Sequence, residues 1–491
     1  MPRFFLLRLS TALCFCLLVC GEVWAFVPSS GTGSADASRW TVTSQGPTGL
    51  AGRPASLTWS IVPDGTLAFD IENSQFEGSD LIAMLDAEFG AGPGGSNLML
   101  RPWFTHINAA FERWDALSGL SFEYEDDDDG STHGGTLAPG QNNVRGDIRL
   151  AGVGLDGSSG TLAYSAFPVD GGDQALDTDD ASFFGNPSST FRQLRNTIMH
   201  ELGHGLGLDH VVTDADFLME ASINTLFDGP QHDDLRGIHW FYGDALEKTN
   251  NGQGNENHTL ATNLGTLFTG SSLAIGTSGN GTEIGPDEID FVSIANPQDD
   301  DYFSFTVSEA VRLDVTLTPR GGQYTQSGTP FDTTTTSDLA LTLFDTNGTS
   351  VLSTASSQPA GVVESIDSFV LPAGGQYFVR VDGADPVVQF YELLVAAESL
   401  VPSLLGDYNE NGVVDAADFT VWRDSFGQSV GAYSGADGDG DGLIGPGDYS
   451  VWSSNFGSSA SSGLSVPEPG AITLLFSGIL LFVRRCRVRY S

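Results

Sequence analysis

Cysteine and lysine are both scarce in this 491-residue sequence. Three of its four cysteines precede residue 21 and the fourth is Cys486, so the long segment between them contains no disulfide framework. Stability must therefore come from packed cores or bound metal ions. Lys248 is the only lysine, and 20 basic against 63 acidic residues leave a formal net charge of −43. Such a charge repels phosphate backbones, which argues against nucleic acid as a partner.

The first 25 residues have the pattern of a secretory signal peptide. Arg3 and Arg8 flank the start of an apolar stretch, and Val23 and Ala25 supply small residues at −3 and −1 of a cleavage site. We therefore expect export through the Sec route and a mature chain that begins at Phe26. An N-terminal membrane anchor is the alternative, although the apolar run is shorter than the ~20 residues that a span needs.

The C-terminal end carries a second targeting pattern. A Val-Pro-Glu-Pro sequence at 466–469 precedes an almost wholly apolar stretch at 470–483, and four arginines follow within 484–489. These parts resemble a PEP-CTERM sorting tail. The resemblance implies a tail that interacts with the membrane before sorting, and an extracellular or cell-surface protein of a Gram-negative-type bacterium. A permanent span is the alternative, but ~14 apolar residues are few for one.

Composition shifts divide the rest of the chain. Residues 26–54 are rich in Ser, Gly and Thr and weakly patterned, whereas apolar residues at helical spacing predict helices at 80–89 and 103–117. The acidic run at 123–129 is expected to be a solvated loop, with a calcium site as the alternative. We expect a multidomain chain with a signal peptide at 1–25, a linker or short pro-segment at 26–54, an α+β domain at 55–245, a linker at 246–256, an all-β sandwich at 257–399, a small helical calcium module at 400–460 and the sorting tail at 461–491.

The strongest signal is the sequence HELGHGLGLDH at 200–210. His200 and His204 are one helical turn apart, so both imidazoles project from one face and can hold one zinc ion. Glu201 then lies beside the metal. Gly207 lets the helix end with a positive φ, so that His210 can return as the third ligand. Three protein ligands leave a fourth position for water, which is the arrangement of a catalytic zinc site.

This pattern fits H-E-x-x-H-x-x-G-x-x-H in full, and the chain resembles a metzincin zinc metalloprotease of the matrixin, or matrix metalloproteinase, family. Met219 stands where that family has its Met-turn. The resemblance implies an α+β catalytic domain with a mixed sheet, in which a zinc-activated water attacks the peptide bond and Glu201 is the general base. A protein or peptide substrate is expected to pair with an edge strand at Leu162 and Ala163.

Several positions depart from the matrixin pattern. Tyr164 and Leu176 stand where the family has histidines for a structural zinc, so we expect only the catalytic zinc. No cysteine lies in 26–90, so the thiolate that blocks the zinc in many matrixin zymogens is absent. The Glu-Ala-Ser sequence after Met219 replaces the usual Pro and Tyr, which alters the expected specificity pocket. The candidate calcium ligands of this domain, with surface solvation as the alternative, are Asp156, Asp177, Asp179 and Asp180.

Short alternating runs divided by turn residues predict an antiparallel sandwich over 257–399. Three aspartates before Tyr302 and a Gly-Gly-Gln-Tyr-Phe-Val sequence at 374–379 resemble the bacterial pre-peptidase C-terminal domain. The resemblance supplies no catalytic residues. Adhesion or substrate presentation is one expectation for this domain, and plain spacing with solubility is the other.

Residues 400–460 contain an internal repeat with a period of 30. Oxygen-bearing side chains recur at the positions that calcium loops use, each loop has a glycine at position 6, and a short helix follows each loop. The repeat resembles a dockerin pair and implies structural calcium and a cohesin-like docking partner. The predicted calcium ligands are Asp407, Asn409, Asn411, Asp415, Asp418, Asp437, Asp439, Asp441 and Asp448.

The favoured function is an exported zinc-dependent endopeptidase that acts on extracellular proteins. One alternative is a surface or matrix assembly protein with calcium-dependent docking and a vestigial protease domain. Another is a binding protein whose main task is to dock a partner in a calcium-dependent way. Zinc binding without turnover would identify the vestigial domain, and the intact Glu201 argues against it.

Overall fold

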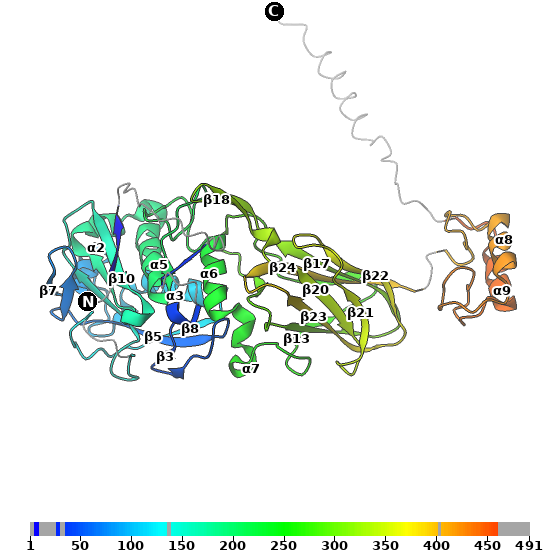
Figure 1. Cartoon of the computed structure of the whole chain (residues 1–491), viewed down its shortest axis with the longest axis horizontal. Coiled ribbons are helices and arrows are strands. Elements are labelled where there is room, and N and C mark those ends of the chain that lie inside the picture. Colours follow the sequence, from blue (N-terminus) through cyan, green and yellow to red (C-terminus); the bar gives the residue numbers. More distant parts are fainter. Residues whose placement is uncertain (1–3, 9–25, 30–34, 135–138, 401–403, 460–491) are drawn as a thin grey trace, which may run out of the picture. The chain divides into compact units, whose positions relative to one another are not determined.

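The computed structural model describes residues 4–8, 26–29, 35–134, 139–400 and 404–459 (Figure 1). Most of the predicted signal peptide and all of the predicted sorting tail lie outside the described residues. The chain divides into two compact units, of which the first ends at Glu398 and the second begins at Ser399. Within the described part of the chain, no helix has the length and apolar character that a membrane span requires.

The first unit contains a six-stranded mixed sheet in the order β1-β10-β11-β9-β5-β8. Strands β8, β5, β9 and β11 run parallel to one another, and β10 joins β11 in the antiparallel sense. Strand β1 pairs antiparallel with the outer edge of β10. The strand bounds are β1 Phe4–Arg8, β5 Ala55–Ile61, β8 Leu120–Tyr124, β9 Ile148–Val153, β10 Thr161–Ala166 and β11 Gln174–Asp177.

Helices α3 (Phe104–Leu117) and α5 (Arg192–Leu206) pack beside each other against this sheet. The Phe111 ring of α3 stacks on Trp59 of β5 with centroids 4.2 Å apart, and the Trp114 indole donates a hydrogen bond to the carbonyl of Met199 on α5. The α+β architecture predicted from the sequence is confirmed. The smaller elements are β2 Val27–Pro28, α1 Ala35–Ser38, β3 Val42–Thr43, β4 Gly46–Pro47, β6 Leu67–Asp70, β7 Gln75–Gly78, α2 Leu81–Phe89, α4 Ala181–Phe184, β12 Leu208–Asp209, α6 His232–Tyr242 and α7 Thr249–Gly252.

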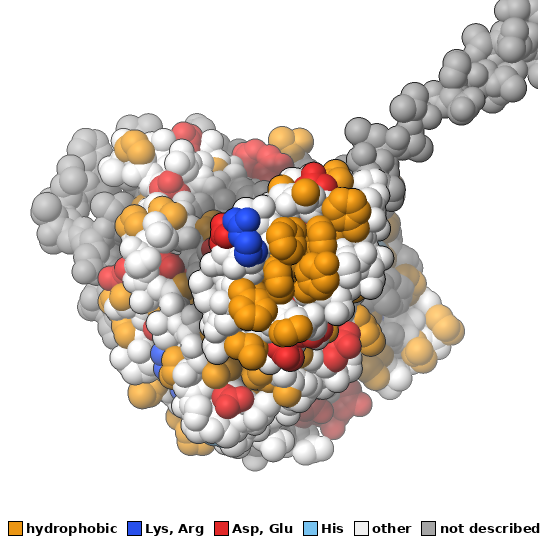
Figure 2. All heavy atoms as spheres, turned by 90° about the vertical axis from the view of Figure 1, so that its right-hand side faces the viewer, with side chains coloured by type: hydrophobic (Ala, Val, Ile, Leu, Met, Phe, Trp, Pro, Cys, Tyr) orange, Lys and Arg blue, Asp and Glu red, His pale blue; other side chains and the backbone are white. Residues whose placement is uncertain are grey.

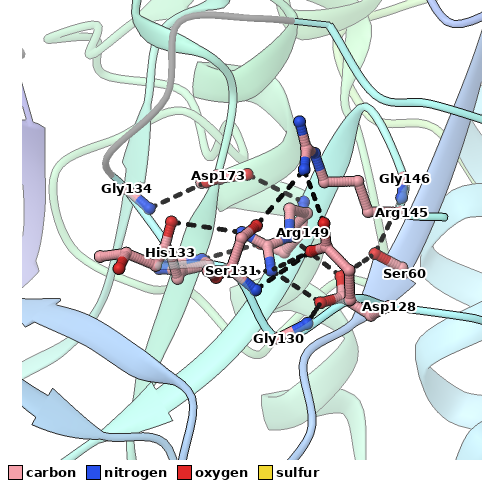
Figure 3. A network of polar contacts seen from close by, with 12 residues as sticks. Ser60, Asp128, Gly130, Ser131, His133, Gly134, Arg145, Gly146, Arg149 and Asp173 are labelled. Carbon is pink, nitrogen blue, oxygen red and sulfur yellow. Dashed lines mark hydrogen bonds and ion pairs between the residues drawn. The ribbon is translucent and has the colours of Figure 1, made fainter.

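The acidic run is not a freely solvated loop along its whole length. Asp128 is buried and forms an ion pair with Arg149 of β9 at 2.7 Å (Figure 3). The Ser60 hydroxyl also donates to Asp128 at 2.7 Å, and the Asp173 carboxylate accepts the backbone N–H of Arg149. This network fixes the loop to the sheet. Elsewhere in the run, Glu125 is half-buried and four acidic residues are exposed, namely Glu123, Asp126, Asp127 and Asp129.

The structure differs from the linker expected at 26–54. Phe26 and Trp40 are only 2% and 4% exposed and belong to the hydrophobic core of the mixed-sheet domain. The Trp40 indole N–H donates to the carbonyl of Gly205 at 2.8 Å, and the Tyr242 hydroxyl donates to the next carbonyl of α5 at 3.0 Å. Two carbonyls that lack helical partners at the end of α5 are thereby satisfied. The segment completes the helix that carries the histidine motif.

Two sheets form the all-β sandwich that follows. The first has the order β13-β16-β23-β20-β21, and the second has the order β14-β24-β17-β22 with β15 also paired to β24. Side chains alternate between buried and half-buried along β17, as a strand with one inward face requires. The bounds are β13 Thr262–Thr266, β14 Ser271–Ile275, β15 Val292–Ile294, β16 Asp301–Val307, β17 Val311–Arg320, β18 Gln323–Gln326, β19 Thr329–Asp332, β20 Leu339–Phe344, β21 Val351–Ala355, β22 Glu364–Leu371, β23 Gly375–Gly383 and β24 Gln389–Ser399.

The sandwich has a core of its own, but several of its residues, among them Phe390, also join the core of the mixed-sheet domain, so residues 246–256 are not a free linker. Phe390 of β24 lies 5.0 Å from the ring of His239 on α6, and the Nδ1 of His239 is 2.8 Å from the hydroxyl of Ser293. Within 246–256, the Lys248 ammonium donates to the Asp115 carboxylate at 2.9 Å. The predicted boundary therefore marks a change of fold and not a flexible joint.

The second unit contains α8 (Ala416–Ser425) and α9 (Pro446–Asn455), each directly after one of the repeated acidic loops. Its buried apolar residues are few: Tyr408, Ala436 and Ile444 form the centre, with Trp422 and Trp452 packed partly against them. So small a core provides little hydrophobic stabilisation.

Candidate functional site

The three predicted zinc ligands meet at one point. His200 and His204 lie on α5, and the helix ends at Gly207 with φ = +117°. A Cβ atom on Gly207 would also lie 2.5 Å from the Ser38 carbonyl oxygen, so both the backbone conformation and the space require glycine. The turn brings the Nε2 of His210 to 3.1 Å from that of His200 and 3.2 Å from that of His204.

The chemistry of these rings fits a zinc ion. The Nδ1 of His200 lies 2.6 Å from the Leu218 carbonyl oxygen and that of His204 lies 2.8 Å from the Leu208 carbonyl oxygen. Those Nδ1 atoms therefore carry the protons, and the facing Nε2 atoms carry lone pairs. Burial lowers the pKa of His200 to about 4 and that of His210 to about 3, so the rings stay neutral. Tetrahedral zinc with bonds of ~2.0–2.1 Å would separate its nitrogens by about 3.3 Å, close to the observed distances.

Glu201 lies fully buried on the same helix, next to His200. Among the described residues neither of its carboxylate oxygens has a hydrogen-bond partner, and burial raises its pKa well above the usual range. A buried carboxylate without partners is costly to a fold and is rarely kept for stability alone. Its side chain is free to exchange a proton with a molecule in the site.

Met219 lies directly against the motif helix. A Cβ atom on Gly203 would be 3.0 Å from the Met219 Cε and closer still to its Sδ, so this glycine leaves the space that the methionine fills. The Asp234 carboxylate of α6 accepts the backbone N–H groups of Leu218 at 2.8 Å and Met219 at 3.0 Å. Sequence reasoning identified Met219 but missed Gly203 and Asp234, because their roles depend on contacts between distant segments.

Strand β10 passes close to the histidines, since Phe167 just after it lies edge-on to His204 with centroids 5.8 Å apart. The side chains of Leu162 and Ala163 are fully buried, so the strand can contact another segment only through the backbone N–H and C=O groups along its edge. In the structure β1 pairs along this edge, with Leu7 opposite Ala163. The predicted edge strand can therefore accept an extended segment.

Comparison with known proteins was consistent with this geometry. Residues 102–243 match the family described as matrixin. Over these residues the chain is similar to the matrixins, a family of metallopeptidases. Residues 299–383, within the sandwich, match the bacterial pre-peptidase C-terminal domain. The resemblances to the matrixin and pre-peptidase C-terminal families are thus supported, whereas those to a dockerin pair and to a PEP-CTERM tail stay predictions.

Known relatives resemble only part of the chain. Matrix metalloproteinase-16 of Homo sapiens is 32% identical over 146 residues, which cover 28% of this chain and 23% of that protein. Matrix metalloproteinase-15 of Homo sapiens is 37% identical over 95 residues, 18% of this chain and 14% of that protein. The chain thus spans less than a quarter of the length of these curated relatives. Among solved structures, the pre-peptidase C-terminal domain of a Bacillus anthracis collagenase aligns with 14% identity and a TM-score of 0.18, over 28% of this chain and 95% of that one.

The positions of the absent structural zinc site and the candidate calcium ligands are engaged in hydrogen bonds or packing. Tyr164 and Leu176 are fully buried, and the Tyr164 hydroxyl donates to the Phe69 carbonyl. Among the four candidate calcium ligands, three accept backbone N–H groups of the loop at 155–161, namely Asp156, Asp177 and Asp180. Asp179 lies beside them, and its backbone N–H donates to Asp177. Within the described residues these aspartates do not form a metal-compatible cluster.

Sequence reasoning missed a second cluster of acidic side chains. Carboxylate oxygens of Glu247, Glu256 and Asp299 lie within 4.8 Å of one another, where the matrixin domain meets the sandwich. Arg53 forms ion pairs with both glutamates. Burial raises the pKa of Glu247 to about 9 and that of Asp299 well above its usual range. The cluster could hold a divalent cation. Glu125, Asp126 and Asp127 form another such group, which is largely exposed.

In the second unit each acidic loop closes around its first and last predicted ligands. Asp407 accepts the N–H of Gly412 at 2.7 Å, and Asp418 accepts the N–H groups of Asn409 and Asp415 at 3.0 and 2.8 Å. The second loop repeats these bonds with Asp437 and Asp448. Carboxylates of Asp437, Asp439 and Asp448 lie close enough to share a metal ion. Asp439 is nevertheless exposed, as are Asn409, Asn411 and Asp441.

An aromatic surface covers α8 and α9, and Figure 2 shows hydrophobic side chains gathered on the face of this unit that is turned to the viewer. Neighbouring rings lie 5.2 to 6.1 Å apart, and both repeats contribute three of them. Three of the side chains are between 42% and 57% exposed. The surface consists of Phe419, Trp422, Phe426, Tyr449, Trp452 and Phe456.

Proposed function

We propose that this protein is an exported zinc-dependent endopeptidase that hydrolyses peptide bonds of extracellular proteins. The observation that supports this best is the meeting of three neutral imidazoles, with Nε2 atoms 3.1 and 3.2 Å apart, beside a buried carboxylate without a partner. This combination provides a metal site and a proton acceptor in one place.

His200, His204 and His210 would hold the zinc ion. When bound, zinc supplies a Lewis acid for the peptide carbonyl and for the attacking water. Glu201 would take the proton from that water and deliver it to the leaving amine, and the raised pKa of its carboxyl makes it a stronger base. Met219 would help to hold the zinc ligands in place, because its side chain packs on Gly203 of the helix that carries His200 and His204.

The substrate class follows from the edge of β10. Backbone pairing there positions an extended chain whatever its sequence, as the pairing of β1 illustrates. Unfolded or loosely folded protein segments can meet that requirement, because their backbone groups are free. Side chains near the histidines would then select among such segments, and Glu220 after the Met-turn is a candidate for this role.

The signal peptide, the C-terminal tail and the second unit would determine the location of the enzyme. The signal peptide would direct Sec export, and the C-terminal tail would interact with the membrane before sorting, which leaves the mature protein outside the cell or on its surface. Structural calcium in the two loops of the second unit would fix α8 and α9. Their aromatic surface would then dock a cohesin-like partner.

Hydrolysis of a denatured protein by the purified full chain tests the function. Glu201→Gln should retain bound zinc and the fold, but lose about 10²- to 10⁴-fold in kcat/KM because it removes the general base without removing a ligand. Glu112→Gln, on the exposed side of α3, is the matched control and should behave like the wild type. Hydrolysis that persists in Glu201→Gln, or in excess chelator, would contradict the proposal. A wild type that binds zinc without turnover would instead favour the vestigial assembly protein.

A further inference from the structure

The third histidine lies on a loop, unlike the other two. His200 and His204 are held by α5, whereas His210 begins the segment that leads to Met219. One backbone bond, from the N–H of Val211 to the Met219 carbonyl at 3.0 Å, ties the two ends of this segment together. The position of the third ligand therefore depends on whatever else holds residues 211–219.

A hairpin of the sandwich pairs with this loop. Strands β18 and β19 form an arm at 323–332 that lies apart from both sandwich sheets (Figure 1). The N–H of Ser327 donates to the Val212 carbonyl at 2.8 Å, and the N–H of Asp214 donates to the Thr325 carbonyl at 3.1 Å. In addition, the N–H of Thr325 donates to the Asp214 carboxylate. The hairpin thus forms a β-bridge with the loop, between Gln326 and Thr213, three residues after His210.

The same hairpin also packs against the C-terminal end of the 211–219 loop, through Tyr324. Tyr324 is 6% exposed, and its ring lies edge-on to Phe217 with centroids 4.9 Å apart. Its hydroxyl donates to Asp233 of α6 at 2.7 Å, which precedes the Asp234 that binds the backbone of Met219. Both ends of the 211–219 loop therefore touch the hairpin.

We propose that the β18–β19 hairpin is a positioning element of the metal centre, through which the sandwich holds the His210 loop in place. A ligand on an unsupported loop must be ordered when the metal binds, whereas a ligand held beforehand costs less entropy. Tyr324 is the main positioning residue, because it is the buried anchor of the hairpin. Val212 is 60% exposed next to the hairpin's turn. The inference rests on the proposed zinc peptidase.

Two tyrosines of the full chain allow a matched test. Tyr324→Ala removes the anchor, whereas Tyr377→Ala removes an equally buried tyrosine from the sandwich core, where its hydroxyl donates to the Ala373 carbonyl at 2.9 Å. Zinc loss to a competing chelator should be 10- to 100-fold faster in Tyr324→Ala, as for other residues that orient a metal ligand. Tyr377→Ala should lower the melting temperature and leave zinc loss unchanged. Tyr324→Phe should restore most of the retention, because the ring contact with Phe217 survives.

Hydrogen–deuterium exchange of the metal-free full chain separates this inference from the function. The backbone amides of residues 211–219 should exchange faster in Tyr324→Ala than in the wild type, whereas in Tyr377→Ala their exchange rates should equal those of the wild type. Both results are expected whether or not the protein hydrolyses peptides. Asp214→Ala, an exposed change, should produce a smaller effect in the same direction without a risk to folding. The proposal would be overturned if Tyr324→Ala and Asp214→Ala both exchanged these amides and lost zinc at the same rates as the wild type. Absence of peptide hydrolysis in the wild type would refute only the proposed function.

Discussion

Gly203→Ala should damage the metal site much more than it damages the fold. Alanine in place of glycine stabilises an exposed helix by about 1 kcal/mol, and overpacking a core typically costs about 1–3 kcal/mol. These terms largely cancel, so the free energy of unfolding should fall by no more than ~2 kcal/mol, or a few degrees in melting temperature. The new methyl group, however, would occupy the place of the Met219 Sδ and Cε.

The displaced Met219 would carry its turn with it. Its backbone neighbour Leu218 provides the carbonyl that orients the Nδ1 of His200, so that ring would lose its fixed direction. Loss of such orienting contacts typically costs 10- to 100-fold in metal affinity. Gly205→Ala is the control on the same helix, because its Cβ would come no closer than 3.3 Å to any neighbour, the Gly172 carbonyl oxygen, with Ser165 Oγ at 3.4 Å and Gln174 Nε2 at 3.5 Å.

Competition with a colorimetric zinc chelator gives the affinity, and thermal denaturation gives the stability. Gly203→Ala should lose zinc affinity, and Gly203→Ala combined with Met219→Ala should recover part of it, since the second change makes room for the first methyl group. Two results would contradict this packing argument. Gly203→Ala could bind zinc with the affinity of the wild type, or the losses of zinc affinity from the two single changes could simply add in the double variant.

Two further predictions concern pH and calcium. Burial raises the pKa of Asp233 to about 6, so its protonated form stabilises the fold at low pH and this contribution disappears as pH rises through 6. The wild type should therefore lose on the order of 3 kcal/mol relative to Asp233→Asn between pH 4 and 7, and parallel unfolding curves would contradict this. Residues 404–459 should unfold in chelator and refold when calcium is added. The fluorescence of Trp422 and Trp452 should change together during this transition. A fluorescence spectrum that does not respond to calcium would exclude calcium binding by the two loops.

The sequence predicted the features that local spacing controls. The one-turn separation of His200 and His204, the glycine that ends their helix and the return of His210 are properties of eleven consecutive residues. The alternation along β17 and the helical periodicity of α3 are equally local. Such patterns determine which faces are buried, and hence the fold class, without knowledge of the partner segments.

Features that depend on contacts between distant segments could not be predicted in this way. Trp40 lies alone in a Ser- and Gly-rich stretch, so no periodicity marks it as a core residue. Asp128 stands in a run of acids that suggests solvent, yet Arg149 of a central strand buries it. Pairing between the loop after His210 and the hairpin at Thr325 joins residues more than 100 positions apart and involves one bridge, which leaves no local signal.

The capping of α5 by Trp40 has a consequence for the order in which the protein folds. The bond from its indole to Gly205 spans 165 residues, and the bond from Trp40's own N–H to the Tyr242 hydroxyl spans 202. Contacts of such sequence separation form late, because a long loop must close before they stabilise anything. The motif helix can nucleate early, but its last turn becomes rigid only after the chain has emerged as far as residue 242. A growing chain would therefore carry the histidines without the finished site, so that the candidate metal site is complete only after residue 242 has been added.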